Sequence, residues 1–360
     1  MTNKNGLSAD SLQTAYGWQM TGNMPLLDEI RTNFIQFTER HIARVNTLAS
    51  FINDYYPDHD SDKFTFPFYY LLQWRETGHA LKELPDSEER LTAMIDRDTW
   101  AHVLHNPHHP EHWDKSLSLS QPFERKNPRT NIDATAMTKQ YLNEFVCDCM
   151  SMSIMLDKNP EKVYDWFDKS VGNGKRWRMT DEQIDYIYAT AKYIIGKLKN
   201  PKRKVYFDVD GVLRNITGYF GVPDNDWDIQ VDGKTIYDMI LADFSCLEKM
   251  KSTEYVPVVQ KFTKSPYIIS TQIEQPAKVA TAKWLADRFA LPQATFVGEG
   301  SSAEKVKLLA EDDRIFDDHP KFPESNKLII VGHGYNRNKP GFRVNTVAEM
   351  EGALDVLQAW

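Results

Sequence analysis

A short apolar stretch that ends in two carboxylates constrains the fold of this chain more than any other feature of its sequence. Residues 205–207 (Val-Tyr-Phe) are β-branched or aromatic, and Asp208, Asp210 and Gly211 follow almost directly. The pattern predicts a buried strand that stops at an acidic turn. Two carboxylates this close repel each other, and a divalent cation with oxygen ligands is the usual remedy. Gly211 lets the chain turn sharply and lets a phosphate approach the backbone. Taken alone, the motif fits an ordinary acidic β-turn equally well.

Three further segments with polar ends follow downstream. Two of them are apolar strand signals, at residues 267–269 (Tyr-Ile-Ile) and 315–316 (Ile-Phe), and the third is the start of a helix. They supply two hydroxyls, one lysine and two adjacent carboxylates: Ser270, Thr271, Lys305, Asp317 and Asp318.

The order of these motifs resembles the haloacid dehalogenase superfamily of phosphotransferases. In that superfamily, D-x-D-G, a strand with Ser or Thr, a lysine and a strand with two aspartates follow one another. The resemblance covers residues 202–360 and implies a doubly wound, Rossmann-like α/β domain. Between the first two motifs, residues 215–264 occupy the position of a small helical cap that closes over the substrate.

The resemblance also implies a mechanism. Asp208 would attack phosphorus to form an aspartyl-phosphate, and Asp210 would protonate the leaving oxygen and then activate water. A Mg²⁺ ion would be held by Asp208, by the backbone carbonyl of Asp210, and by Asp317 or Asp318. Which of these two adjacent aspartates contacts the metal first stays open. The presence of Asp210 favours a phosphatase over a dehalogenase, which lacks this second acid.

Phosphate binding is implied for three downstream residues. Ser270 would hydrogen-bond a phosphoryl oxygen, although Thr271 could take this role, and Lys305 would neutralise charge as it develops. The cap aromatics Tyr219 and Phe220 suit a compact substrate such as a nucleoside monophosphate, whose base can stack on a ring. These aromatic residues could equally form the core of the cap.

The front half of the chain shows a different pattern. Apolar residues recur at intervals of three or four, which predicts helices over residues 24–52, 85–104, 137–156, 161–169 and 181–198. Five of the ten histidines lie within residues 102–112. We therefore predict an all-α domain at residues 1–198, followed after a short linker by the α/β domain at residues 202–360.

A histidine beside an aspartate, with a further histidine and aspartate far away in the sequence, resembles the HD superfamily of metal-dependent phosphohydrolases. The finer pattern, HD-x-x-K-F with N-P-H-H-P-E-H-W and E-x-x-x-D, resembles an uncharacterised HD-like family common in phage genomes. The resemblance implies that four residues ligate one metal ion: His41, His59, Asp60 and Asp148. Imidazole and carboxylate ligands together suit Zn²⁺, Mn²⁺ or Fe²⁺.

Three of the histidines within residues 102–112 are further candidate ligands. His105, His108 or His109 could bind a second metal ion or the phosphate of a substrate. These histidines could also be solvated or cap helices, and His41 could be a hydrogen-bonded core residue. At Asp62 the chain departs from the resembled family, which usually has serine at this position.

Composition limits the partners and the compartment. The formal net charge of −8 argues against a broad nucleic-acid surface, although it leaves room for a local basic groove. The three cysteines form no disulfide framework, which favours a reducing cytoplasm, that of the host if a phage encodes the chain. No stretch approaches about 18 consecutive apolar residues, so we expect no membrane partner. The sequence does not indicate an oligomeric state.

These observations favour a two-domain phosphohydrolase. We expect Mg²⁺-dependent hydrolysis of a small phosphomonoester, most plausibly a nucleotide, because the segment after a strand at residues 328–331 is similar to the 5′-nucleotidase-like branch. Two alternatives stay open. One is a 3′-phosphatase that processes nucleic-acid ends, and the other is a phosphatase whose front domain is a non-catalytic, metal-stabilised module that binds a partner.

Overall fold

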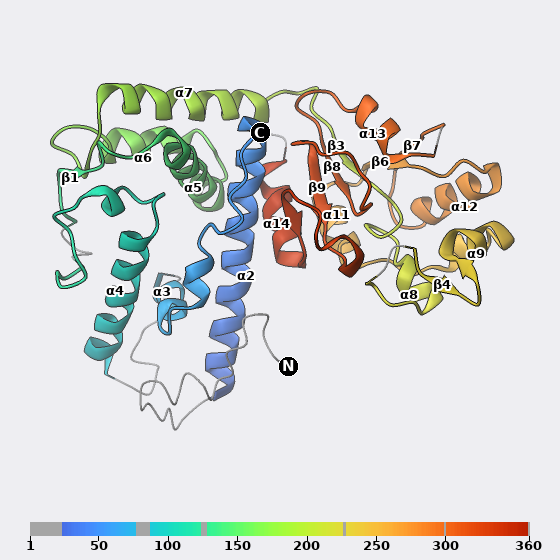
Figure 1. The fold of residues 1–360 in the computed structure, drawn as a ribbon, viewed down its shortest axis with the longest axis horizontal. Coiled ribbons are helices and arrows are strands. Elements are labelled where there is room, and N and C mark those ends of the chain that lie inside the picture. The colour runs from blue at the N-terminus through green and yellow to red at the C-terminus, as the bar shows by residue number, and fades with distance from the viewer. Residues whose placement is uncertain (1–23, 77–86, 124–127, 226–227, 299, 359–360) are drawn as a thin grey trace. The chain divides into compact units, whose positions relative to one another are not determined.

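The computed structural model describes residues 24–76, 87–123, 128–225, 228–298 and 300–358 (Figure 1). The chain divides into two compact units. The helical unit comprises the described parts of residues 1–39, 58–146 and 162–189, and the α/β unit comprises those of residues 40–57, 147–161 and 190–360. The predicted boundary between residues 198 and 202 stays a prediction, because the division by compactness also assigns three earlier segments to the α/β unit.

The front half of the chain is mostly helical, as its periodicity predicts. Its longer elements are α2 (Met24–Ala49), α3 (Tyr69–Glu76), α4 (Glu88–His105), α5 (Lys139–Asp157), α6 (Lys162–Ser170) and α7 (Asp181–Leu198). Short elements connect them: η1 (Ser50–Ile52), η2 (Ser61–Phe64), η4 (Pro110–Trp113), β1 (Ile132–Asp133) and β2 (Trp177–Arg178). Five predicted helices therefore appear close to their predicted bounds, although residues 85 and 86 lie outside the described part of the chain.

Helix α4 illustrates how the sequence sets the orientation of a helix. The side chain of Ser87 accepts a hydrogen bond from the backbone N–H of Arg90 at 3.2 Å, which caps the first turn. The buried residues Leu91, Ile95 and His102 recur at helical spacing and face the interior of the unit. His105 lies outside this stripe and is exposed.

A six-stranded parallel sheet forms the centre of the α/β unit. Its strands are β3 (Val205–Phe207), β6 (Tyr267–Ser270), β7 (Gln293–Phe296), β8 (Arg314–Asp317), β9 (Leu328–Val331) and β10 (Arg343–Val344). They are arranged in the order β10-β9-β8-β3-β6-β7. Strands β3, β8 and β9 are buried at every residue, as expected for a parallel sheet covered on both faces. The α/β prediction for the back half is confirmed at this level.

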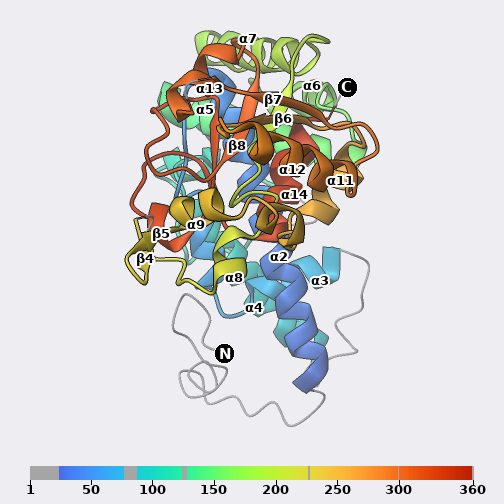
Figure 2. The same cartoon turned by 90° about the vertical axis from the view of Figure 1, so that its right-hand side faces the viewer.

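The strand order has a functional consequence. Read from β7 to β10, the strands follow the chain as 3-2-1-4-5-6, which is the order of doubly wound sheets. The direction of winding reverses between β3 and β8, and ligands of such sheets bind in the crevice beyond the carboxyl ends at this point. The helices that follow the strands are α11 (Val256–Phe262), α12 (Gln275–Ala286), α13 (Ser302–Leu308) and α14 (Val347–Val356), shown from a second direction in Figure 2.

The segment between β3 and β6 carries its own small helices. These are α8 (Ile216–Phe220), α9 (Ile236–Ala242) and α10 (Cys246–Lys249), with the hairpin β4 (Gln230–Val231) and β5 (Lys234–Thr235). Buried residues of this insert, such as Leu247 and Met250, pack against Ala277 and Ala280 of α12. Phe220 packs against the same cluster, whereas Tyr219 is 40% exposed. Phe220 therefore belongs to the core of the insert, and Tyr219 remains available for contact.

Within the part of the chain that the structure describes, no helix is both long and apolar enough to cross a membrane. The three cysteines, Cys147, Cys149 and Cys246, are buried, and none of them forms a disulfide bond.

A glycine on α14 offers a test of the packing in the α/β unit. A Cβ atom added to Gly352 would lie 2.2 Å from the backbone oxygen of Arg40 on α2, so Gly352→Ala should destabilise the protein by about 1–3 kcal/mol. Gly196 on α7 has nothing within 4 Å of the same added atom. Gly196→Ala should therefore leave stability unchanged or raise it by up to about 1 kcal/mol, since alanine is the better helix former. Thermal denaturation of both variants checks this, and equal melting temperatures would contradict the close packing of Gly352.

Candidate catalytic and metal sites

Three carboxylates meet at the reversal point of the sheet. Strand β3 pairs with β8 so that Phe207 lies opposite Phe316, and the backbone N–H of Asp208 donates to the oxygen of Phe316 at 2.9 Å. This register brings Asp208 next to the end of β8. One oxygen each of Asp208, Asp317 and Asp318 lie within 4.8 Å of one another. The structure therefore brings together the first and last predicted motifs.

Lys305 from α13 completes this group. Its Nζ donates to Oδ2 of Asp208 at 2.8 Å and to Oδ2 of Asp317 at 2.7 Å, and only 1% of the residue is exposed. Burial alone lowers the pKa of Lys305, but the two carboxylates outweigh this effect and hold the pKa above its usual value. One ammonium faces three carboxylates, so the buried group keeps an excess of negative charge.

The excess negative charge contributes to raised pKa values of two of the carboxyl groups. Burial raises the pKa of Asp208 to about 7, against the opposing effect of the Lys305 ammonium and with a further contribution from Asp317. Burial also raises the pKa of Asp318 well above its usual value, and Asp208 and Asp317 add to the effect. The Oδ1 atom of Asp318 is buried and has no hydrogen-bond partner among the described residues. An all-oxygen group with excess negative charge and one unsatisfied oxygen fits a hard cation such as Mg²⁺.

The loop after β9 supports Asp318. The hydroxyl of Tyr335 donates to Oδ2 of Asp318, and Nδ2 of Asn336 donates to its backbone oxygen at 2.7 Å. Gly211 lies against the same carboxylate, because an added Cβ would be 2.0 Å from Oδ2 of Asp318. Its φ of +83° is also unfavourable for residues with a side chain. The glycine predicted from D-x-D-G is therefore required by both close packing and backbone conformation.

Asp210 lies in a separate polar ring. Its Oδ1 accepts from Nε of Arg214 at 2.7 Å and its Oδ2 accepts from Nε2 of Gln272 at 3.0 Å. Thr281 closes the ring, since its hydroxyl accepts from Arg214 at 3.2 Å and donates to Oε1 of Gln272. Both oxygens of Asp210 thus face donors, which fixes the orientation of the carboxylate.

The two candidate hydroxyls occupy different positions. Ser270, at the end of β6, is 2% exposed, and its Oγ accepts from the backbone N–H of Gln272 at 3.3 Å. Thr271 lines a cavity of about 380 Å³ together with Asp208, Asp210 and Asp318. The insert contributes apolar side chains to this cavity, Ile236, Tyr237, Ile240, Leu241 and Phe244, together with the polar residues Thr217, Asp228 and Thr235. Accessibility favours Thr271, while the choice between the two phosphate ligands stays open.

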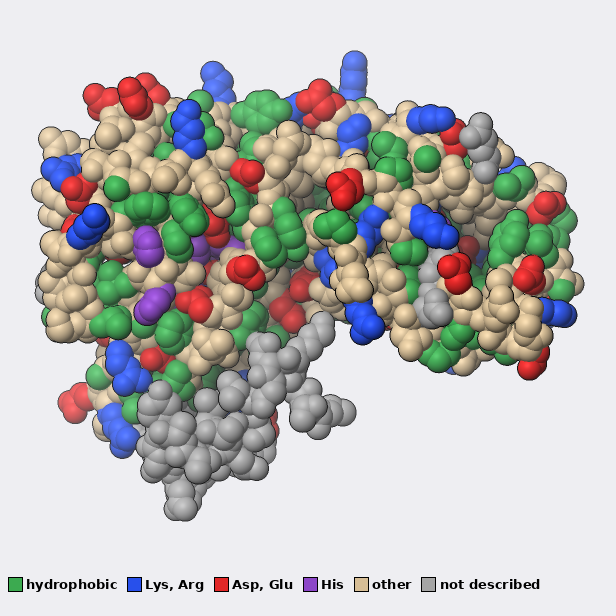
Figure 3. All heavy atoms as spheres, in the orientation of Figure 1, with side chains coloured by type: hydrophobic (Ala, Val, Ile, Leu, Met, Phe, Trp, Pro, Cys, Tyr) green, Lys and Arg blue, Asp and Glu red, His purple; other side chains and the backbone are tan. Residues whose placement is uncertain are grey.

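A second cluster of possible ligands lies in the helical unit. Figure 3 shows several histidine side chains, in purple, on one face of this unit. Side-chain atoms of Asp60, His102, His108 and His109 lie within 4.8 Å of one another. The Oδ1 of Asp60 is 3.2 Å from Nε2 of His102 and 3.6 Å from Nε2 of His108. The Nε2 atoms of His109 and His102 are 3.0 Å apart. These buried nitrogen and oxygen atoms form a cluster that could hold a transition metal ion.

Carboxylates behind the rings orient the imidazoles. The Oε1 of Glu144 on α5 lies 2.8 Å from Nδ1 of His59 and 3.3 Å from Nδ1 of His108. Because a carboxylate accepts, each Nδ1 donates to Glu144, and each Nε2 lies on the side of Asp60. The Nε2 of His108 is buried and has no hydrogen-bond partner in the described part of the chain. Although burial opposes it, hydrogen bonds from His108 and His59 lower the pKa of Glu144 to about 2.

Asp62 acts on His102 in the same way. Its carboxylate lies 3.0 Å from Nδ1 of His102 and accepts from Nδ2 of Asn106 at 2.6 Å. Burial opposes ionisation here, but these hydrogen bonds lower the pKa of Asp62. The departure from serine at this position thus gives the chain a carboxylate that orients His102. Asp60 itself has a φ of +57°, a conformation that aspartate tolerates better than most residues and that is common at functional sites.

The other predicted ligands are placed as follows. His41 and Asp148 belong to the α/β unit, where Nε2 of His41 is 3.1 Å from Oδ1 of Asp148 and the Oγ of Ser151 is 3.0 Å from its Nδ1. His59 and Asp60 belong to the helical unit, and the prediction that these four residues hold one ion stays a prediction. His105 lies outside the cluster, is exposed, and has its Nδ1 3.0 Å from the backbone oxygen of Ala101.

Several residues of both sites were not predicted as functional from the sequence. They are Glu144, His102 and Asp62 in the helical unit, and Arg214, Gln272, Thr281, Tyr335 and Asn336 in the α/β unit. Two signals were available. Tyr335 and Asn336 follow a buried strand, whose carboxyl end meets the same edge of the sheet as those of β3 and β8. His102 lies on the apolar stripe of α4, whereas His105 does not.

Comparison with known proteins adds one finding. Residues 31–193 match the model of a protein family of unknown function, DUF5662. This segment includes the whole histidine cluster and none of the α/β motifs. No curated protein matches the chain.

The histidine cluster predicts a selective loss of metal. His102→Gln should lower the amount of bound Zn²⁺, Mn²⁺ or Fe²⁺ by at least about tenfold, because a ligand nitrogen is lost from the centre of the cluster. His105→Gln is the matched control, three residues away on the same helix, and should keep the metal of the wild type. Elemental analysis of both purified proteins gives the result. Equal metal content in the two variants would contradict the cluster as the binding site.

Proposed function

We propose that the α/β unit is a Mg²⁺-dependent phosphomonoesterase of the haloacid dehalogenase type, and that it acts through an aspartyl-phosphate on Asp208. One observation carries the proposal: Asp208, Lys305, Asp317 and Asp318 converge at the reversal point of a doubly wound sheet. The donor set of Asp208, Asp317 and Asp318 fits Mg²⁺, and the bound ion would screen the charge of the carboxylates and of the incoming phosphate.

In the first step, Asp208 attacks phosphorus and the ester oxygen leaves. Lys305 holds one oxygen of Asp208 at 2.8 Å, which fixes the carboxylate and offsets the charge that develops on the phosphoryl group. Asp210 gives its proton to the leaving oxygen. The hydroxyl of Thr271, on the wall of the same cavity, or that of Ser270 donates to a phosphoryl oxygen.

In the second step, water cleaves the aspartyl-phosphate. Asp210, now ionised, takes a proton from the water and returns to the acid form as phosphate leaves. The donors Arg214 and Gln272 aim the two oxygens of Asp210. The ring through Thr281 therefore positions the residue for both halves of the cycle.

The cavity supports a compact substrate with an apolar or aromatic portion. Its polar floor is formed by Asp208, Asp210 and Asp318, while Tyr237 and Leu241 on the insert offer apolar surface opposite. A nucleoside monophosphate matches this division, because its phosphate and its base have these two characters. We therefore propose a 5′-nucleotide as the substrate.

For the helical unit we propose a metal-dependent phosphohydrolase centred on Asp60, in keeping with the resemblance to HD-like proteins. Support comes from the convergence of His102, His108 and His109 on this carboxylate. If Asp60→Asn loses metal while every phosphohydrolase activity persists, the unit is instead a metal-stabilised module that binds a partner.

The covalent step can be tested by trapping the intermediate. With p-nitrophenyl phosphate, whose leaving group needs no proton, Asp210→Asn should still be phosphorylated on Asp208 but lose water attack. Intact mass spectrometry after an acid quench should show the phosphorylated chain. Asp208→Asn should show no adduct and a turnover at least about 10³-fold below wild type. An adduct on Asp208→Asn would refute the assignment of the nucleophile.

The substrate class can be tested by comparing several phosphorylated compounds in parallel. Phosphate release from nucleoside 5′-monophosphates, 5′-triphosphates and a 3′-phosphorylated oligonucleotide distinguishes the proposals. Turnover of monophosphates that disappears in Asp208→Asn supports a nucleotidase. Reaction of the oligonucleotide alone would replace the nucleotide by a nucleic-acid end.

The polar ring around Asp210 predicts an effect on kcat more than on KM. Gln272→Leu keeps the size of the side chain but removes the donor to Asp210, so kcat should fall about tenfold while KM changes by less than about twofold. Gln293→Leu, at an exposed position on β7, is the control and should behave as wild type. An unchanged kcat in Gln272→Leu would show that this contact does not act on Asp210 during turnover.

A further inference from the structure

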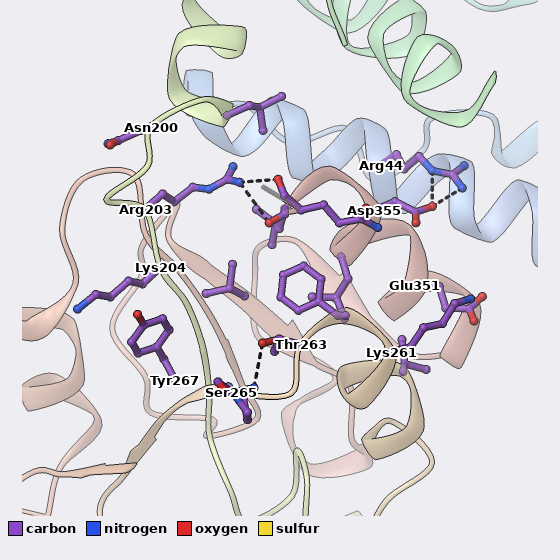
Figure 4. A pocket seen from close by; sticks show the side chains of 18 of the residues that line it. Arg44, Asn200, Arg203, Lys204, Lys261, Thr263, Ser265, Tyr267, Glu351 and Asp355 are labelled. Carbon is purple, nitrogen blue, oxygen red and sulfur yellow. Dashed lines mark hydrogen bonds and ion pairs between the residues drawn. The ribbon is translucent and has the colours of Figure 1, made fainter. Parts of the chain in front are cut away.

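A larger cavity lies in the α/β unit, at the edge of the sheet opposite to the catalytic carboxylates. It has a volume of about 840 Å³ and is bounded by the residues at the starts of β3 and β6, including Lys204, Val205 and Tyr267 (Figure 4). In Figure 4, Lys204 and Tyr267 lie on one side of the cavity and the pair of Arg44 and Asp355 lies on the other. Neither the predicted motifs nor the proposed phosphatase uses this cavity.

The charge of this cavity is opposite to that of the chain. The whole sequence has a formal net charge of −8, yet the wall carries seven basic residues and only two carboxylates, an excess of five positive charges. The basic residues come from four separate segments: Arg40, Arg44, Lys158, Lys199, Arg203, Lys204 and Lys261. Basic side chains from several elements therefore line one cavity.

Neighbouring acids neutralise only part of this charge. Arg40 pairs with Glu351 at 3.2 Å, Arg44 pairs with Asp355 at 2.6 Å, and Lys199 pairs with Glu161 at 2.6 Å. These pairs use both carboxylates of the wall. The remaining four basic residues have no ion pair with the described carboxylates: Lys158, Arg203, Lys204 and Lys261.

Two of the three arginines on the wall carry buried donors that have no hydrogen-bond partner among the described residues. Arg44 has only 5% of its side chain exposed, and its Nη1 has no hydrogen-bond partner among the residues described. The Nη1 of Arg203 is in the same state, although its Nη2 donates to the backbone oxygens of Leu357 and Gln358 at 3.2 and 3.0 Å. Guanidinium groups held in place with incomplete hydrogen bonding favour a nearby anion.

Apolar surface shares the wall with these cations. Phe262, Tyr267 and Leu354 line the cavity, and Nζ of Lys204 lies 4.9 Å from the centre of the Tyr267 ring. A ligand that only carried charge would leave this surface without a contact. A ligand with both a polyanionic and an apolar or aromatic part would use the whole wall.

We propose that this cavity binds a compact polyphosphate compound of the nucleoside triphosphate class. Four basic residues that form no ion pair with the described carboxylates match the charge of a triphosphate, although Asp312 and Asp313 also act electrostatically on Arg203. The volume falls within the range of about 300–1,000 Å³ typical of small-molecule sites. The cations surround a hollow instead of following a line, which favours a compact ligand over a nucleic-acid strand. Binding here does not depend on the chemistry at Asp208.

The proposal can be tested by calorimetric titration of the full-length chain. The chain carries Asp208→Asn, which prevents turnover, and the buffer contains EDTA, which removes metal-dependent binding elsewhere. ATP and inorganic triphosphate are the probes, and both should bind. Combining Lys204→Glu with Lys261→Glu should weaken both by at least about tenfold, because two attractive charges become repulsive. Lys192→Glu, at an exposed lysine of α7 outside the wall, is the matched control and should bind as the parent chain does.

Hydrogen exchange on the parent chain provides a measurement that needs no cavity variant. ATP should protect the amides of residues 199–205 and 258–267, which line the cavity. Undiminished affinity in the double charge reversal, or protection elsewhere only, overturns the proposal. Binding of adenosine as tight as that of ATP would show that the phosphates are not recognised. Binding of a single-stranded oligonucleotide but not of triphosphate would assign the cavity to nucleic acid instead.

Discussion

The repulsion among Asp208, Asp317 and Asp318 is the constraint on which the carboxyl end of the sheet in the α/β unit depends. Burial raises the pKa values of Asp208 and Asp318, and one ammonium, that of Lys305, cannot balance three carboxylates. The arrangement persists because the backbone enforces it: β3 and β8 are adjacent parallel strands, and each runs into its acidic residues at the same edge. A cation among the three carboxylates would relieve the repulsion.

Several neighbouring residues accommodate the Asp318 carboxylate or separate Asp210 from the acidic group. Gly211 leaves room for the Asp318 carboxylate, and Tyr335 supplies it with a donor from the next loop along the sheet. Asp210 is kept out of the acidic group, since Arg214 and Gln272 hold both of its oxygens. Two aspartates that are two residues apart in the sequence thus meet different environments. Different environments are what a nucleophile and a proton carrier require.

The sequence predicted those parts of the structure that depend on local pattern. Helices α2, α5, α6 and α7 and the strand that ends at Asp208 follow from periodicity and composition, and the parallel pairing of β3 with β8 brings Asp317 to Asp208. The partners behind the ligands depend on packing between distant segments, which periodicity does not encode. Glu144 lies 85 positions from His59 in the sequence, and only the packing of α5 brings the two together. His102 was not predicted as a ligand, although it is buried on α4, whereas the predicted His105 is exposed.

The helical unit has a different constraint from the carboxyl end of the sheet. At the end of the sheet, carboxylates must be separated or their charge compensated, whereas in the helical unit imidazole rings must be oriented so that their Nε2 atoms converge. Glu144 and Asp62 do this by accepting hydrogen bonds from the Nδ1 atoms of His59, His108 and His102, so that each Nε2 points to the side of Asp60. In this arrangement the Nε2 atoms of His102 and His108 face Oδ1 of Asp60, while Nζ of Lys63 donates to Oδ2 of the same carboxylate at 2.6 Å. A positive ion is the partner that satisfies the two Nε2 atoms and Oδ1 together, and this is the physical reason to expect a metal at Asp60.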